Sequence, residues 1–200
     1  MRFYKVIQRI RDAEFKGVKL IGPSVIDFEY SNSVRSLFNL YKVKYNAISS
    51  LLYVDRRGSP YNKQLFFFDT KNKVKLLYAI SKLSRKSSDD IYISEVNWPL
   101  LSKGKYSPIL YGYKVSALKS FYKNRVKPLL GASEETSVSE EVYAKYMLDY
   151  HEIVKNTKAV KRLYWHQLIA PGYGLVDDSG DTLRKMPAFY VYKKFIKDNS

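Results

Sequence analysis

The chain has 200 residues, of which 46% are hydrophobic and 27% are charged, and it contains no cysteine. This composition is typical of a globular domain with a sizeable core, and it excludes disulfides and cysteine-ligated metal. No apolar run is long enough to span a bilayer, and the first residues lack the apolar centre of a signal peptide. We therefore expect a cytoplasmic protein.

The formal net charge is +16, with lysines spread over nearly every segment. Such a charge is typical of proteins that bind nucleic acid or another polyanion, and also of a solvated basic surface. Residues 119–127 and 155–162 are among the denser basic segments, and each holds only four basic residues. No RNA-binding aromatic motif, basic zipper or zinc-finger spacing is present. We favour a solvated surface and do not expect nucleic acid as a partner.

Helical and strand patterns alternate along the first part of the chain. The first apolar stretch has helical spacing, and Gly17 follows it in a position that ends many helices. The next stretch is apolar and extended, and Gly22 and Pro23 interrupt it. The predicted order to this point is helix 5–15, strand 18–26, helix 33–43 and strand 47–54.

The same alternation continues to the end of the chain. Residues 101–136 are rich in glycine, proline, serine and tyrosine at first, and we interpret them as an insertion at the rim of the sheet. Ser137 and Glu140 have the spacing of a capping box, which predicts a helix start there. On that helix we expect His151 at the surface. The remaining predictions are helix 71–86, strand 91–96, a helix from the capping box to about residue 154, strand 159–168 and a last helix with Pro187 in its first turn.

This order predicts an α/β fold with a parallel sheet, because strands that alternate with helices are joined by right-handed crossovers. Four strands cannot close an eight-stranded barrel, so residues 1–200 form either a small open sheet or half of a barrel, in one domain. Parallel sheets place active sites at the carboxyl ends of their strands. The polar and aromatic residues at these ends are Asp27, Glu29, Tyr53, Asp55, Glu95, Asn97, Trp165 and Gln167.

Four segments at these strands carry a family resemblance. They read Leu-Ile-Gly-Pro at 20–23, Asn-Ala-Ile-Ser-Ser-Leu-Leu-Tyr at 46–53, Ile-Ser-Glu-Val-Asn at 93–97 and Leu-Tyr-Trp-His-Gln at 163–167. In this order they resemble strands five to eight of a retaining (β/α)8 glycoside hydrolase of the clan that includes β-xylosidases and α-iduronidases. Residues 53–58 and 170–175 are similar to bacterial glycosidase-like proteins of polysaccharide and lipopolysaccharide gene clusters.

The resemblance implies a function in carbohydrate metabolism, with a polysaccharide or glycolipid glycan as substrate. Glu95 takes the position of the nucleophile, and Tyr53 would donate a hydrogen bond to it. Trp165 takes the position of a tryptophan that stacks on a sugar ring, and His166 replaces it at the rim if the strand register differs by one. No metal and no cofactor are implied. The other substrate-binding residues that we predict are Asn97, Trp98, Gln167 and Tyr173.

Two departures from the family pattern concern the catalytic pair. The acid/base glutamate of the clan follows an asparagine at the end of the fourth strand, and this sequence contains no Asn-Glu pair. Leu51 stands where relatives often carry histidine. We therefore expect a truncated or split glycosidase that associates with a missing N-terminal half or with a second copy. The alternative is a non-catalytic basic module that binds nucleic acid or anionic polysaccharide.

Overall fold

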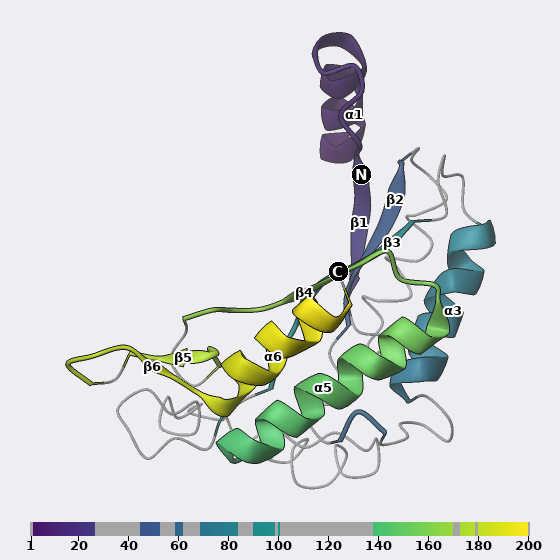
Figure 1. Ribbon diagram of the computed structural model, residues 1–200. Coiled ribbons are helices and arrows are strands. Elements are labelled where there is room, and N and C mark those ends of the chain that lie inside the picture. Colours follow the sequence, from purple (N-terminus) through teal and green to yellow (C-terminus); the bar gives the residue numbers. More distant parts are fainter. Residues whose placement is uncertain are drawn as a thin grey trace, which may run out of the picture. The chain divides into compact units, whose positions relative to one another are not determined.

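The computed structural model describes residues 2–26, 45–52, 59–61, 69–83, 90–98, 100, 138–169, 173–178 and 180–199 (Figure 1). The chain forms two compact units. The first, the sheet unit, comprises Met1–Leu52, Lys71–Glu95 and Val154–Tyr164. The second, the aromatic unit, comprises Tyr53–Thr70, Val96–Ile153 and Trp165–Ser200. That the two units fold together as one domain stays a prediction.

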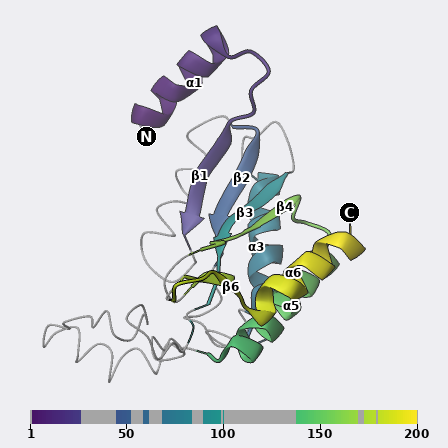
Figure 2. The same cartoon turned by 60° about the vertical axis from the view of Figure 1, so that its left-hand side comes forward.

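The sheet unit is built on a four-stranded sheet with the order β1-β2-β3-β4 (Figure 2). Strand β1 pairs in parallel with β2, and β2 pairs in parallel with β3. The N–H of Lys161, just before β4, donates to the carbonyl of Ile91 at 2.8 Å. The parallel sheet and its α/β class are thereby confirmed. The strands are β1 (Ile21–Ile26), β2 (Ala47–Leu51), β3 (Ile91–Val96) and β4 (Arg162–Trp165).

Helix α3 (Thr70–Leu83) provides the core of the sheet unit. Its Leu77 and Ile80 pack against Ile48 of β2 and Ile91 of β3, together with Tyr45. The branched side chains of the two strands suit a pleated, buried surface, and removing each from water contributes roughly 1.5–3 kcal/mol. The core therefore marks one face of the sheet, which we call the helix face.

Helix α1 (Arg2–Glu14) ends as its sequence predicts. Gly17 has a φ of +95°, a left-handed conformation that glycine adopts without steric cost. The N–H of Phe15 donates to the carbonyl of Arg11 at 2.9 Å, and the N–H of Val18 donates to the carbonyl of Phe15 at 3.0 Å. These bonds close the last turn and direct the chain towards β1.

The register of β1 on β2 contains an irregularity at the predicted glycine-proline break. Ile21 lies opposite Ala47, whereas Ser24 lies opposite Ser49, so three steps along β1 correspond to two along β2. A β-carbon on Gly22 would come within 2.9 Å of the Tyr45 ring. The Gly-Pro pair therefore does not end the strand: it forms a bulge within β1, and Gly22 permits the close approach of the tyrosine.

The aromatic unit contains α5 (Glu140–Thr157) through Ile153, α6 (Pro187–Asp198), and a short antiparallel pair, β5 (Val176–Asp177) and β6 (Arg184–Lys185). The first residue of α5 is Glu140, and the N–H of Val142 donates to the hydroxyl of Ser139 at 3.4 Å. The predicted helix is confirmed and Ser139 caps it, whereas Ser137 of the predicted capping box lies outside the described residues. Pro187 opens α6 as predicted.

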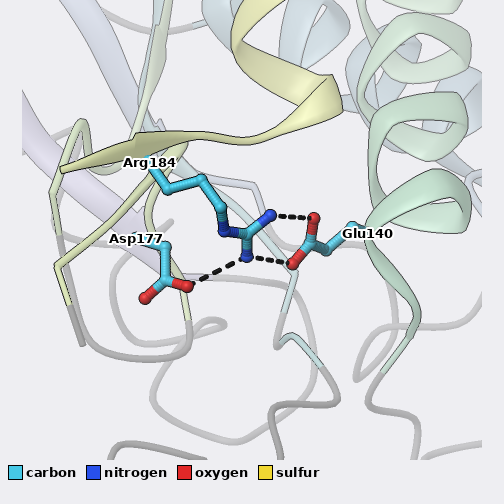
Figure 3. A network of polar contacts seen from close by, with 3 residues as sticks. All are labelled: Glu140, Asp177 and Arg184. Atoms are coloured by element: carbon cyan, nitrogen blue, oxygen red, sulfur yellow. Dashed lines mark hydrogen bonds and ion pairs between the residues drawn. The ribbon is translucent and has the colours of Figure 1, made fainter. Parts of the chain in front are cut away.

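Arg184 joins the β5–β6 pair to the first turn of α5 (Figure 3). Its guanidinium donates to both carboxylate oxygens of Glu140, at 2.9 and 2.6 Å, and to Asp177 at 2.9 Å. These hydrogen bonds raise the pKa of Arg184 above its ordinary value. The negative charge of Glu140 also lies at the positive end of the helix dipole, where it is favourable.

Several predicted features lie outside the described residues. They are the helix at 33–43, Asp27 and Glu29, Tyr53 with residues 54–58, and the rim insertion at 101–136.

Candidate functional site

Glu95 lies at the carboxyl end of β3, and a β-bulge sets the face on which it lies. Ser50 lies opposite Ile93, but the next residue of β2, Leu51, lies opposite Glu95. Residue 94 is therefore the extra residue of a bulge in β3. Strict alternation would have placed Glu95 with Ile91 and Ile93 on the helix face. Because paired residues of neighbouring strands share a face, the bulge turns Glu95 to the opposite face.

Serine hydroxyls follow the same face across three strands. Ser24 lies opposite Ser49 in the paired strands. The hydroxyl of Ser49 donates to that of Ser94 at 2.9 Å, and Ser94 donates to the carbonyl of Ser50 at 3.2 Å. The hydroxyl oxygen of Ser24 is buried and has no hydrogen-bond partner within the described part of the chain. This polar face of the sheet, defined by Ser24, Ser49, Ser94 and Glu95, contrasts with the apolar helix face.

Glu95 is partly exposed, so its carboxylate can be reached from solvent. Its neighbours Ile93 and Val96 are completely buried and fix the strand on either side of it. The structure therefore places Glu95 on a rigid element, at the edge where a parallel sheet presents functional groups. Tyr53, the predicted hydrogen-bond donor to this carboxylate, lies outside the described residues.

The aromatic unit brings together the two tryptophans of the chain. Trp98 is completely buried, and Trp165 stacks on it with ring centroids 5.6 Å apart and 17° between the ring planes. Tyr146 and Tyr150 pack around Trp98 at 5.8 and 5.7 Å. A side chain with no exposed surface supports its neighbours rather than contacting a ligand. In this arrangement Trp98 therefore backs Trp165, which is partly exposed.

Hydrogen bonds fix the orientation of the Trp165 ring. Its indole N–H donates to the hydroxyl of Tyr143 at 2.8 Å, and that hydroxyl donates to the carbonyl of Tyr173 at 2.7 Å. Tyr143 is completely buried, and burial raises its pKa far above the ordinary value. The phenol therefore remains protonated and can continue to donate. The predicted residues Trp165 and Tyr173 are thus linked through Tyr143, a residue that was not predicted to belong to the site.

His151 is buried, which corrects the expectation of a surface histidine. It is only 6% exposed, and its ring lies 5.3 Å from Trp165, 5.3 Å from Tyr192 and 5.0 Å from Phe195. The expectation was wrong because α6 packs along α5 and covers this position, and the α5 sequence alone does not show which helix faces it. Figure 1 shows the two helices side by side.

The protonation state of His151 follows from its surroundings. Nδ1 lies 2.7 Å from the carbonyl of Met147, so Nδ1 carries the proton, and Nε2 has no hydrogen-bond partner within the described residues. Burial among aromatic rings lowers the pKa of His151 to about 4. The imidazole is therefore neutral near pH 7, and its ring serves as one wall of the aromatic cluster.

The other predicted residues of this unit lie in different surroundings. Asn97 is 5% exposed, and its side-chain oxygen has no partner among the residues that the structure describes. A buried amide oxygen without a donor is costly, so a donor from elsewhere would be stabilising there. Gln167 is exposed, and its side-chain nitrogen lies within hydrogen-bond distance of the His166 ring. Both are candidates for contact with a polar ligand.

No cluster of three or more histidine, aspartate or glutamate side chains suitable for a metal ion occurs in the described ranges. Within those ranges, too, no helix is long and apolar enough to cross a membrane.

Comparisons of the sequence with models of known protein families and with curated proteins found no match for this chain.

Proposed function

We propose that the chain is the C-terminal half of a retaining glycoside hydrolase barrel, with Glu95 as its nucleophile. The observation that carries the proposal is the bulge of β3, which turns Glu95 away from the helix face. The helices of a (β/α)8 barrel surround its sheet, so the face away from them lines the interior, and catalytic groups come from the carboxyl ends of the strands. Bulges recur next to active sites because they re-aim a side chain in this way.

The chemistry assigned to Glu95 is nucleophilic displacement. Its carboxylate attacks the anomeric carbon, the glycosidic carbon–oxygen bond breaks, and the leaving oxygen takes a proton from a second carboxyl about 5–5.5 Å away. Water then hydrolyses the glycosyl ester and inverts the anomeric carbon again. The second carboxyl would come from the missing half of the barrel, because the sequence has no Asn-Glu pair.

The proposal gives Trp165 the role of the sugar-stacking tryptophan. A partly exposed indole, held from behind by Trp98 and oriented by the hydrogen bond to Tyr143, offers a rigid apolar surface to the face of a sugar ring. The side-chain oxygen of Asn97, which has no partner among the described residues, is the kind of acceptor that a sugar hydroxyl satisfies. The substrate class is a polysaccharide or glycolipid glycan, as the resemblance implies.

The test uses a substrate that does not need the absent acid. A dinitrophenyl 2-deoxy-2-fluoroglycoside has a leaving group that departs without a proton, and its fluorine slows hydrolysis of the glycosyl ester, so the covalent adduct accumulates. We expect intact-mass and peptide mass spectrometry to locate an adduct on Glu95 for at least one sugar of a panel. Glu95→Gln should abolish it, and Glu152→Gln, at an exposed position of α5, should retain it. An adduct that persists in Glu95→Gln, or none with any sugar, contradicts the proposal.

The net charge of +16 favours a second candidate, a non-catalytic basic module for nucleic acid or anionic polysaccharide. This candidate predicts an affinity that falls steeply as salt is raised, because binding releases counterions. Titrations of a labelled oligonucleotide and of an anionic polysaccharide at two salt concentrations test it. If neither the oligonucleotide nor the polysaccharide binds, or if the affinity does not change with salt, this second candidate function is excluded.

A further inference from the structure

Helix α1 carries an apolar stripe that is open to solvent. Phe3, Val6 and Ile10 are three and four positions apart, so they lie on one face of the helix. They are 76%, 43% and 44% exposed. Single exposed apolar residues are ordinary, but a contiguous apolar stripe marks a binding surface.

A different side of α1 holds it to the sheet unit. The Tyr4 hydroxyl donates to the carbonyl of Ile21 at 3.0 Å, and Arg11 donates to the side-chain oxygen of Asn46 at 2.8 Å. Burial and the neighbouring phenol of Tyr45 raise the pKa of Tyr4 to about 12, so this phenol stays a donor. The exposed stripe is therefore not the surface through which α1 packs, and covering it requires no rearrangement of these contacts.

The apolar surface continues beyond the end of α1. Phe15, Val18 and Ile21 are 55%, 56% and 41% exposed along the segment that leads into β1. The helix and this segment thus present six large apolar side chains within about twenty residues of sequence.

Positive charge accompanies the stripe. Lys5 and Arg9 are exposed on the helix, and residues 2–21 contain six cationic and two acidic residues. One of the two acidic residues, Asp12, is paired with Arg11 at 2.7 Å. The surface therefore combines exposed phenylalanine and isoleucine with an excess of positive over negative charge, which is the composition of helices that lie in the interface of an anionic membrane.

We propose that α1 binds the surface of an anionic lipid bilayer, with its axis in the plane of the interface. Phe3, Val6 and Ile10 enter the boundary between headgroups and acyl chains, while Lys5 and Arg9 extend to the lipid phosphates. The charge argues against a second copy as the occupant, because pairing two such stripes would bring cationic side chains of both copies together. This inference is independent of any glycosidase activity.

The test is flotation of the full chain with phosphatidylcholine vesicles that contain about one third phosphatidylglycerol, compared with pure phosphatidylcholine. We expect binding to the anionic vesicles only, and loss of most of it at about 1 M salt, where the Debye length is near 3 Å. Lys5→Gln and Arg9→Gln should each weaken binding about fivefold. Phe3→Gln with Ile10→Gln should weaken it tenfold or more, on the order expected for two partly inserted apolar side chains.

The matched control is Leu183→Gln, which removes a large side chain that is 65% exposed outside α1. Glutamine is a good helix former, so the α1 variants should retain their circular dichroism and melting temperature. Binding that is absent, or equally strong in the α1 variants, overturns the proposal, since the net charge alone would then account for any attraction. A dimer in sedimentation without lipid that Phe3→Gln abolishes also overturns it, because the stripe would then be a self-association surface.

Discussion

Replacing His151 by phenylalanine should remove most of the acid sensitivity of folding between about pH 6.5 and pH 4. In the unfolded chain this histidine has an ordinary pKa near 6.5, whereas in the folded protein burial lowers its pKa to about 4. Between these two values the unfolded chain binds more protons than the folded one. Stability is therefore fully present above about pH 6.5 and is lost as the pH falls towards 4.

The magnitude follows from the difference between the two pKa values. A separation of about 2.5 units corresponds to roughly 3 kcal/mol at about 1.4 kcal/mol per unit, a large share of the 5–15 kcal/mol that is typical of a domain. Phenylalanine keeps the ring packing against Trp165 and Phe195 but cannot ionise. It also loses the bond to the carbonyl of Met147, which costs about 1 kcal/mol at every pH.

The assay is urea denaturation at a series of pH values from about 7 to about 4, for the wild type and for His151→Phe. Taking the difference between the two curves cancels the titration of the carboxylates, which both proteins share. The matched control is His166→Gln, because His151 and His166 are the two histidines of the chain. We expect the wild type and the control to lose stability in parallel and His151→Phe to lose roughly 3 kcal/mol less. Parallel curves for all three proteins would refute the assignment of a buried neutral imidazole.

Three further predictions concern a close steric contact, an ion-pair network and a buried hydrogen bond. Gly22→Ala should destabilise the fold by about 1–3 kcal/mol, because its β-carbon would lie 2.9 Å from a tyrosine ring, whereas Gly180→Ala, with no atom within 4 Å, should be close to neutral in thermal melts. Arg184→Ala should cost about 1 kcal/mol at low salt and less at high salt, because its ion pairs are exposed; salt-independent loss would contradict this. Trp165→Phe should lower stability by about 1–3 kcal/mol by leaving the buried hydroxyl of Tyr143 without its donor, and unfolding in urea that matches the wild type would exclude this role.

The order of elements was predictable from the sequence because local signals carry it. Gly17 favours the end of α1 because glycine adopts a left-handed conformation without steric cost. Pro187 favours the start of α6 because its fixed φ suits the first turn of a helix. The alternation of strands and helices then leaves few arrangements other than a parallel sheet. That the sheet is half of a barrel stays a prediction, because closure depends on strands that this chain would not contain.

The surroundings of the candidate residues were less predictable. The environment of His151 depends on α6, which lies about forty residues further along the chain. The contact of Trp165 with Tyr143 likewise joins two elements through tertiary packing. The glycine-proline pair at 22–23 did signal an irregularity in β1, whereas nothing in the residues around Ser94 marks the bulge of β3.

That bulge lets β3 carry one residue more than its pairing with β2 requires, while Glu95 keeps Leu51 as its partner. If Ser94 were deleted, Glu95 would follow Ile93 directly, and regular alternation would still place it opposite Leu51 on the polar face. The deletion would therefore remove the bulge and the hydroxyl that accepts from Ser49, but it would not turn the carboxylate into the apolar core. The strand can thus lose this one residue while the face that carries the carboxylate stays the same.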